Sequence, residues 1–396
     1  MATTARGGER PPRGALWRDP RFRGLLAQAV VLGLVIAAGA YLVHNTIVNR
    51  ERLGVASGFE FLSRQAGFDV SQSLIDFSSD RSSYGRAFLV GLLNTLYVAA
   101  VGIVLATIIG FVMGIARLSS NWLVARLALV YIEVIRNVPL LLQLIFWYVV
   151  VLGALPGPRD SLVVLGIGYL NVRGLFLPKP IFEEGAVLEL LALFVAIVVV
   201  VAIARWARLR REATGRGFPT FWVGLAILIL VPLGTHLALG GPISFEHPRL
   251  TRFRLEGGLV LLPEFLALVL GLSVYTGAFL AEIVRSGILS VGKGQLEAAA
   301  ALGLTPKQTL RLVVIPQALR VIIPPQTSQY LNLTKNSSLG VAIGYPDFFN
   351  VAGTVNNQTG QAVEVIAITM AVYLSFSLAI SAFMNWYNAK MALVER

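Results

Sequence analysis

The stretch that decides the fold reads RSGILSVGKGQLEAAAALGLTPKQTLRLVVIPQALR and covers residues 285–320. Its alanine- and leucine-rich part, residues 295–302, favours a helix, and Gly303 suits the left-handed position that follows a helix end. The sequence TPKQ at 305–308 is a capping box with proline in the first turn, which starts a second helix. The sequence therefore predicts two short helices joined at Gly303, the second of which ends near Pro316.

Long apolar stretches flank this helix–Gly–helix segment, residues 295–316, which we call the elbow. A bilayer core about 30 Å thick requires about 20 apolar residues of helix. Seven stretches meet this length, and an eighth, more polar one carries a Pro-Pro break at 324–325. In chain order they cover residues 25–43, 87–116, 122–152, 187–204, 220–239, 259–284, 318–343 and 361–387. Backbone polar groups in lipid must pair within their own segment, so we predict an all-α integral membrane protein with eight transmembrane helices.

Composition excludes the soluble classes of protein. Of the 396 residues, 56% are apolar and 14% are charged, whereas soluble domains carry about 25% charged residues. The absence of cysteine excludes disulfides and thiolate metal sites, and three histidines leave little scope for a metal cluster. No phosphate-binding loop of the G-x-x-x-x-G-K-[ST] type, nucleophile elbow or zinc motif occurs. We therefore expect no enzyme activity, no metal and no cofactor on this chain.

Basic residues predict the orientation, because Lys and Arg gather in cytoplasmic loops. Six arginines lie between positions 6 and 23, and others recur at Arg117, at 205–216, in the elbow and at Lys390 and Arg396. Eight spans place all of them on the same side of the membrane, whereas seven would put the C-terminal pair outside. We therefore predict a multi-pass protein with both termini cytoplasmic. The net charge of +12 then belongs to inside loops and does not indicate nucleic-acid binding.

The elbow resembles a motif of one transporter family. Its residues Glu297-Ala298-Ala299, Gly303 and Val313-x-Ile315-Pro316 are similar to the EAA loop of ABC-importer permeases, with Val and Ile in place of Ile and Leu. The resemblance implies that the elbow docks in a groove of a nucleotide-hydrolysing subunit and transmits its motion. The residues to which it assigns this coupling are Glu297, Ala298, Ala299, Gly303 and Pro316.

Three flanking stretches, 131–150, 276–288 and 331–344, resemble polar amino-acid permeases of the histidine/glutamine type. The long layout is similar to the general L-amino-acid permease subunits of alphaproteobacteria. The resemblance covers 87–152 and 259–390 and implies a five-helix permease core with extra helices outside it.

The division that follows has six parts. They are a cytoplasmic tail (1–24), an extra N-terminal helix with a periplasmic loop (25–86), the first part of the core (87–156), an insertion with two extra helices (157–258), the second part of the core with the elbow (259–390) and a cytoplasmic tail (391–396).

The function that the resemblance implies is uptake. The chain would be the transmembrane permease subunit of an ATP-driven ABC importer in the bacterial inner membrane, for polar L-amino acids of the glutamate, glutamine, aspartate and asparagine kind or a broader range. Implied partners are a dimer of ATP-binding subunits that carries ATP and Mg²⁺, a second permease subunit that is a related chain, and a periplasmic amino-acid-binding protein.

Polar residues within the spans are candidates for the substrate path. Glu133 and Arg136 lie three apart in the third stretch and can share a helix face. They are either a structural ion pair or part of the path, because ionisable groups at this depth face a partner or a cavity. Asn137 is a further path candidate, and Pro139 should loosen the helix locally. We expect Glu282 and Arg285 to form a salt bridge near the inner end of the sixth stretch.

The span 318–343 is the least apolar and cannot face lipid along its whole surface. Amide and hydroxyl groups can both donate to a carboxylate and accept from an ammonium group, as a zwitterionic amino acid requires. The path candidates in this span are Gln329, Asn332, Lys335, Asn336 and Ser337.

An amino-acid transporter driven by an ion gradient is the alternative to an ATP-driven importer. It would explain an ionisable Glu133 within the membrane, and it predicts a matched pair of interrupted helices. The sequence has a single strongly interrupted span, at 324–325, and this alternative leaves the elbow without a function.

Overall fold

The structure is a computed structural model that describes residues 20–53, 58–251 and 255–391. The arginines at positions 6–18 and Arg396, on which the orientation prediction depends, lie outside these residues. The helices are α1 (Pro20–Leu53), α2 (Tyr84–Ala116), α3 (Trp122–Asn137), α4 (Leu140–Ile145), α5 (Ala186–Thr214), α6 (Thr220–Ala238), α7 (Pro263–Leu289), α8 (Lys293–Ala301), α9 (Pro306–Thr309), α10 (Ile315–Asn336), α11 (Phe348–Thr359) and α12 (Ala362–Met391).

Among the described residues, six helices are long and apolar enough to cross a membrane: α1, α2, α5, α6, α7 and α12. A seventh candidate is the bent pair formed by α3 with residues 140–152. Helix α10 lies where the eighth span was predicted. Its polar residues make it less apolar than the seven candidates, and it is not among the helices that are apolar enough to cross a membrane. The count of eight therefore stays a prediction.

The stretch predicted as one span over 122–152 is not one continuous helix. Helix α3 ends at Asn137, and the chain turns by 107° into α4 and the π-helical residues Phe146–Leu152. Val138 and Pro139 at the turn are extended (ψ 128° and 136°). The physical reason is that Pro139 has no amide hydrogen and disfavours helix in the residue before it. The sequence indicated a local loosening, and the structure has a complete break.

The core of the bundle is built on the contact between α2 and α7. Small residues let the two backbones approach closely, as the fourfold spacing of Gly102, Ala106, Gly110 and Gly114 in α2 allows. A Cβ atom added at Gly110 would lie 2.4 Å from Leu280 Cβ, and one at Gly114 would lie 2.7 Å from the Ala281 carbonyl oxygen. Helix α10 then packs on α7 and α2, and α11 packs on α2.

The segment after α10 closes one end of the bundle through buried polar groups. Asp347 caps α11 by accepting from the amide of Asn350 at 2.9 Å, and its second oxygen accepts from the Tyr373 hydroxyl of α12 at 3.3 Å. Asn94 of α2 donates to the carbonyls of Gln72 and Pro346 at 2.8 and 2.9 Å. Both Asp347 and Asn94 are fully buried. Helix α11 was not predicted, although this cap and Gly360 at φ +68° are ordinary helix-end signals.

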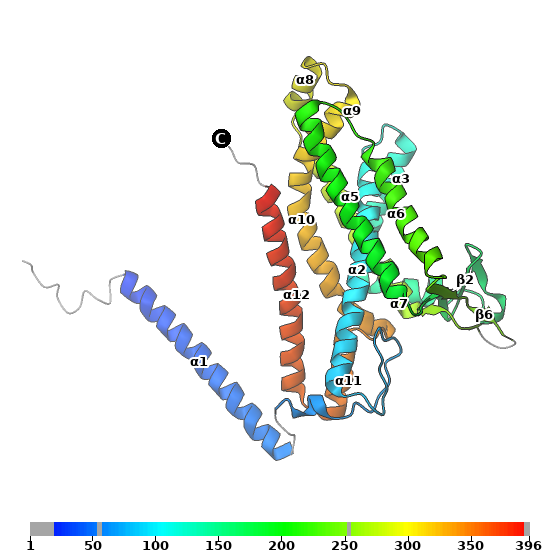
Figure 1. The fold of residues 1–396 in the computed structure, drawn as a ribbon. Coiled ribbons are helices and arrows are strands. Elements are labelled where there is room, and N and C mark those ends of the chain that lie inside the picture. Colours follow the sequence, from blue (N-terminus) through cyan, green and yellow to red (C-terminus); the bar gives the residue numbers. More distant parts are fainter. Residues whose placement is uncertain (1–19, 54–57, 252–254, 392–396) are drawn as a thin grey trace, which may run out of the picture.

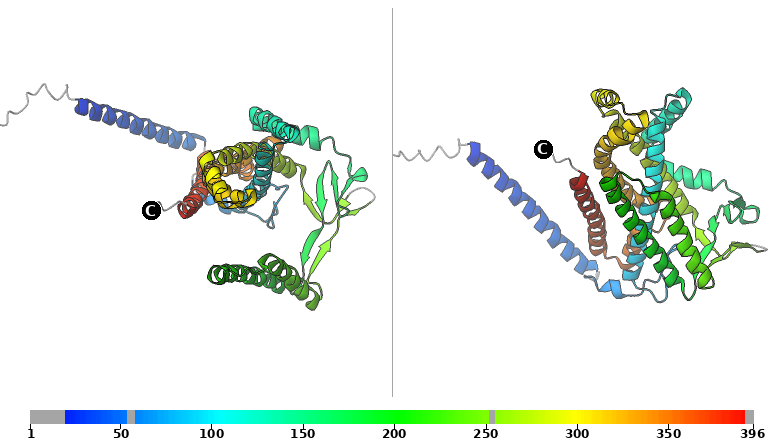
Figure 2. Two further views of the ribbon diagram at one scale, coloured as in Figure 1. Left: turned by 90° about the horizontal axis from the view of Figure 1, so that it is seen from above. Right: turned by 45° about the horizontal axis from the view of Figure 1, so that its top comes forward.

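The insertion contains the two predicted helices and, in addition, short strands. These are β1 (Leu162–Val164), β2 (Gly168–Asn171), β3 (Gly174–Leu177), β4 (Lys179–Phe182), β5 (Ile243–Glu246), β6 (Arg249–Leu250) and β7 (Leu255–Glu256), and β8 (Leu259–Leu261) follows directly after the insertion. They form antiparallel sheets of order β1-β2-β3-β8, β4-β5 and β6-β7. Helices α5 and α6 pack mainly on each other. Figure 2 shows this helix pair apart from the bundle, and the strands link the pair to the bundle.

Several of the basic segments lie towards one end of the molecule, although the start of α1 does not. Figure 1 shows the turn between α2 and α3, the end of α5, the elbow and the last turns of α12 towards the top, and the strands and α11 towards the bottom. We call the upper end the elbow side. This arrangement groups the α2–α3 turn, the end of α5 and the elbow at one end, as the basic-loop pattern requires.

The α2–α7 contact gives a stability prediction. Gly110→Ala should lower the free energy of unfolding by about 1–3 kcal/mol, because the new methyl group overpacks the contact with Leu280. Gly353→Ala in α11 is the matched control, since no atom lies within 4 Å of the added carbon; its higher helix propensity should leave stability equal or raised by up to about 1 kcal/mol. Thermal unfolding in detergent measures both. Equal midpoints for the two variants would contradict the close contact.

Asp347 gives a pH prediction. It lies outside the candidate spans, and burial raises its pKa from 3.8 to about 6, although the amides of Asn350 and Phe349 and the Tyr373 hydroxyl favour the carboxylate. The native state therefore binds a proton more tightly than the unfolded chain, and the free energy of unfolding rises as pH falls from about 6 towards 4.

Asp347→Asn keeps the cap and does not titrate, so it isolates this effect. The variant should be more stable than the wild type near neutral pH, by an amount on the order of 3 kcal/mol, and should lose the advantage near pH 4. Unfolding midpoints of both proteins across this range measure the difference. A difference that does not change with pH would show that Asp347 is not buried in its charged form.

Candidate functional site

The elbow projects beyond the end of the helical bundle (Figure 1). Most of its motif residues are exposed. Glu297, Ala298 and Gly303 are exposed, whereas Ala299 is buried. Helix α8 ends in a Schellman motif, in which the amide of Leu304 bonds to the Ala299 carbonyl at 3.1 Å. Gly303 at φ +71° holds the left-handed position that this motif requires. The apolar side chain of Leu302 is 80% exposed at the tip.

The second helix of the elbow begins as predicted and does not end as predicted. The Thr305–Gln308 capping box is present, with Pro306 in the first turn. The helix does not stop near Pro316. It continues from α9 through the π-helical residues Leu310–Val314 directly into α10. Proline in the first turn of a helix needs no amide hydrogen bond, and a π-helical turn changes the pairing just before it, so Pro316 joins two helical segments and ends neither.

Helix α10 has a buried face whose polar groups are satisfied. Gln326 donates to the Tyr330 hydroxyl, which lies 2.6 Å from the Thr107 hydroxyl of α2. Thr327 and Thr334 donate to carbonyls one turn earlier in α10. Prolines 324 and 325 lie within the helix and do not break it, so the predicted Pro-Pro break is wrong. The Tyr330–Thr107 contact joins α10 to α2, whereas Gln326, Thr327 and Thr334 bond within α10.

The opposite face of α10 is open and polar. Asn332 and Lys335 are exposed on it, and Gln329 and Asn336 are half-buried. Lys335 lines a hollow of about 580 Å³ between the end of α10 and α12, together with Ser338 and Tyr373. Ser337 differs from the other candidates, because it is fully buried and its hydroxyl donates to the Thr334 carbonyl at 2.8 Å.

The break after α3 holds the second group of candidates. Glu133, Arg136 and Asn137 are exposed, and Asn137 donates to the Glu133 carbonyl at 2.7 Å. The Arg136 guanidinium lies 5.1 Å from the ring centre of Phe279 of α7, a cation–π contact. In the described part of the chain no ion pair joins Glu133 to Arg136. The structural ion pair that was one explanation of these residues is therefore not formed.

Gln143 stabilises this break and was not a predicted site residue. It is buried, and its Nε2 donates to the carbonyls of Ile135 and Val138 at 2.9 Å each. These are carbonyls that the loss of helix at Pro139 leaves without their usual partners. The signal in the sequence was a glutamine four residues after a proline in an otherwise apolar run.

Glu282 and Arg285 form the expected salt bridge in α7. Arg285 Nη2 lies 2.6 Å from Glu282 Oε1, and Nε lies 3.0 Å from Oε2. Arg117 and Arg136 also act on Glu282 electrostatically. Helix α3 packs on α7 and α2, whereas α10 packs on α7, α12 and α2. The candidates thus form two separate groups, one at the α3 break and one on α10.

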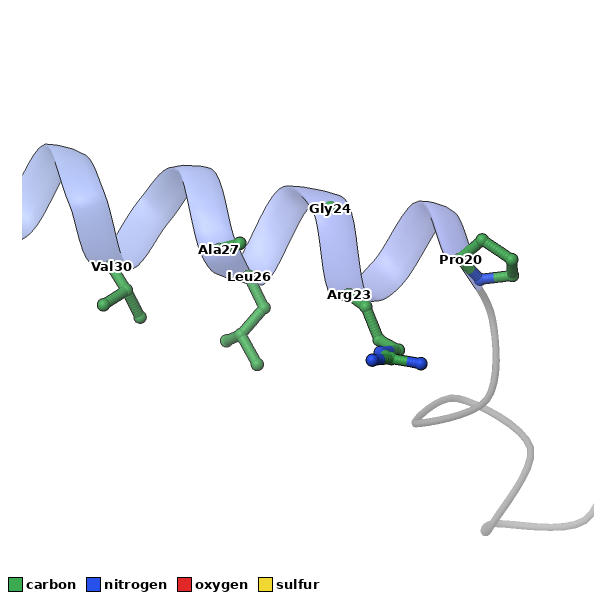
Figure 3. Close-up of a pocket in the computed structure, with 6 residues that line it drawn as sticks. All are labelled: Pro20, Arg23, Gly24, Leu26, Ala27 and Val30. Atoms are coloured by element: carbon green, nitrogen blue, oxygen red, sulfur yellow. The ribbon is translucent and has the colours of Figure 1, made fainter.

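Two other features do not form a site. Among the described residues, no group of three or more His, Cys, Asp or Glu could hold a metal ion. Figure 3 shows a hollow beside the start of α1, and the six labelled residues that line it all come from this one helix.

Comparison with known proteins identifies the family. Residues 213–393 match the family described as binding-protein-dependent transport system inner membrane component. A general L-amino acid transport system permease protein of Rhizobium johnstonii is 54% identical over 97% of this chain and 96% of its own length. The chain belongs to the amino-acid ABC transporter permeases. The resemblance inferred from the elbow and its flanks is confirmed.

Two further relatives extend this finding, and one solved structure is also similar to this chain. A putative amino-acid ABC transporter permease protein of Escherichia coli is 49% identical to the permease, over 97% of this chain and 98% of its own. A glutamate/glutamine/aspartate/asparagine transport system permease protein of Rhodobacter capsulatus is 41% identical, over 96% of each chain. A crystal structure of an amino acid ABC transporter with histidines covers 78% of this chain and 95% of that chain, at 21% identity and a TM-score of 0.46.

Proposed function

We propose that this permease is the transmembrane subunit of an ATP-driven importer of polar L-amino acids, among them glutamate, glutamine, aspartate and asparagine. The named transport systems of the Rhizobium and Rhodobacter relatives support this substrate class. The mixed donors and acceptors on the open face of α10, with one cation at Lys335, suit a zwitterionic solute with a second polar group.

The observation that carries the coupling mechanism is the continuity between the elbow and α10. Helical backbone runs without interruption from Pro306 through the π-helical turn to Asn336. A force on the elbow is therefore delivered along one helix to Asn332 and Lys335. A partner can shift the equilibrium between two states only by contacting them differently, and the exposed elbow offers Glu297, Ala298 and Leu302 for such contacts.

The partners that fit this mechanism are a dimer of ATP-binding subunits, which would carry ATP and Mg²⁺, and a second, related permease chain that encloses the path. A periplasmic binding protein would deliver the amino acid at the end that carries the strands and α11. The elbow side would then face the cytoplasm, with both termini on that side of the inner membrane.

An importer driven by an ion gradient finds no support in the described part of the chain. That mechanism predicts paired interrupted helices, whereas one bent pair is present, at Pro139. The prolines of α10, which might have provided the second interruption in the sequence, lie in an unbroken helix.

The elbow is tested by two pairs of substitutions. Glu297→Lys reverses the charge at the proposed contact, and Glu184→Lys makes the same change at an exposed site in the insertion. Gly303→Val strains the left-handed position, whereas Gly303→Asn tolerates it. We expect Glu297→Lys and Gly303→Val to lose a co-purifying ATPase, and the two controls to retain it.

The measurement is affinity purification of the tagged permease from its native host in mild detergent, followed by mass spectrometry and an ATP hydrolysis assay. Retention of the ATPase by all four variants would remove the elbow from the coupling mechanism. Uptake of radiolabelled amino acids by the wild-type complex tests the substrate class independently.

The open face of α10 is tested by uptake. Lys335→Met removes the cation on that face and should lower uptake about tenfold, the loss expected for a charge-assisted hydrogen bond of about 1.4 kcal/mol. Thr334→Val is the control, because this hydroxyl bonds only within α10, to the Tyr330 carbonyl. Co-purification of the ATPase should be unchanged in both. Equal uptake by Lys335→Met and wild type would place the path elsewhere.

A further inference from the structure

An apolar cavity of about 580 Å³ lies on the elbow side, between the ends of α2 and α7, the start of α3 and the π-helical turn that leads into α10. Its walls include Phe111 and Ile115 of α2, Val284 and Ile288 of α7, and Val314 and Ile322 of the elbow–α10 connection. The volume lies within the range of small-molecule sites, about 300–1,000 Å³. We propose that an acyl chain of an anionic phospholipid occupies this cavity.

The lining favours an acyl chain over a polar ligand. Of the fourteen described residues that line the cavity, Ser119 is the only one with a polar side chain. The apolar lining reaches the protein surface, because Ile115 is 56% exposed and Leu310 is 50% exposed. Since α2 and α7 are candidate spanning helices, the cavity lies where the membrane offers lipid chains.

Basic residues next to the lining favour an anionic headgroup. Arg117 and Arg311 each follow a lining residue directly in the sequence, namely Ala116 and Leu310. Glu282, the acidic residue on which Arg117 acts electrostatically, is already bound to Arg285. A basic residue near the membrane surface attracts anionic lipid by about fivefold in affinity.

Because of its position, a lipid in the cavity should affect coupling. This effect on coupling rests on the proposed function, whereas the lipid site itself does not. The π-helical turn Leu310–Val314 forms one wall, and it joins the elbow to α10. An acyl chain in the cavity fills the gap between this turn and α2. Motion of the elbow is then passed on through a packed contact, so lipid composition should alter how much transport accompanies each ATP hydrolysed.

The site is tested with a photoactivatable lipid. The full-length permease, with the subunits that co-purify with it, is reconstituted into phosphatidylcholine nanodiscs that contain phosphatidylglycerol with a diazirine on one acyl chain. After illumination, peptide mass spectrometry locates the adducts. We expect saturable labelling within 111–124 and 310–322, and non-saturable labelling of exposed residues of α12 such as Leu378 and Phe383.

Substitutions separate the acyl chain from the headgroup. Val314→Trp fills the cavity and should reduce its labelling several-fold, whereas Val321→Trp, on the exposed side of α10, should not. Arg117→Gln should lower the preference for diazirine phosphatidylglycerol over diazirine phosphatidylcholine about fivefold. Arg208→Gln, an exposed cation of α5, should leave the preference unchanged.

Three results would overturn the proposal. The first is labelling of the cavity that rises with lipid concentration without saturating, as on α12. The second is equal labelling by the two lipids in the wild-type protein. The third is the capture of an ATPase or permease subunit, in place of lipid, by a photo-crosslinking amino acid placed at position 310. The first two use the wild type, so they decide the question even if Val314→Trp does not fold.

Discussion

The close approach of α2 and α7 is the contact on which the rest of the permease depends. Gly110 and Gly114 bring α2 against Leu280 and Ala281 with no room for a side chain, and each helix then carries a different part of the molecule. Helix α7 leads directly into the elbow, and α2 supports α10 and α11. If the two helices were farther apart, α10 could not pack on both of them at once. The position of the π-helical turn and of the open face of α10 would then no longer be fixed. The absence of side chains at Gly110 and Gly114 thus sets the spacing of the two helices on which α10 packs.

Helix α10 combines two environments that are usually found on different helices. One face bonds to α2 through Tyr330 and Thr107, and the other leaves Asn332 and Lys335 exposed. The Tyr330–Thr107 bond adds a polar contact to the packing of α10 on α7 and α2, and the exposed polar groups are those proposed for the solute path. Because the same helix continues into the elbow, the proposed path residues and the proposed coupling segment belong to one continuous helix. The break at Pro139, capped by Gln143, is a separate feature on the other side of α7.

Apolar length made most of the spanning helices predictable, since a helix that crosses lipid must be long and apolar whatever it packs against. The capping box at Thr305 and the left-handed Gly303 were predictable because their causes are local. The bend at Pro139 was only half predictable: a proline shows that one hydrogen bond is lost, but the 107° angle depends on the packing of α4 against α7. The short strands of the insertion have two to four residues each and carry too little pattern to separate from loop. The two faces of α10 depend on which neighbours it meets, and the sequence alone does not specify them.

The insertion has a consequence for how such a permease can vary. Its two helices contact mainly each other, and antiparallel strands at one end connect them to the bundle. The loops at both ends of the insertion leave the core at the same place, because β3 pairs with β8. A hairpin of this kind can be gained, lost or exchanged without repacking α2, α7 or α10. It offers a way to enlarge the lipid-facing perimeter of the subunit, and to add surface outside the bilayer, while the machinery between elbow and path stays as it is.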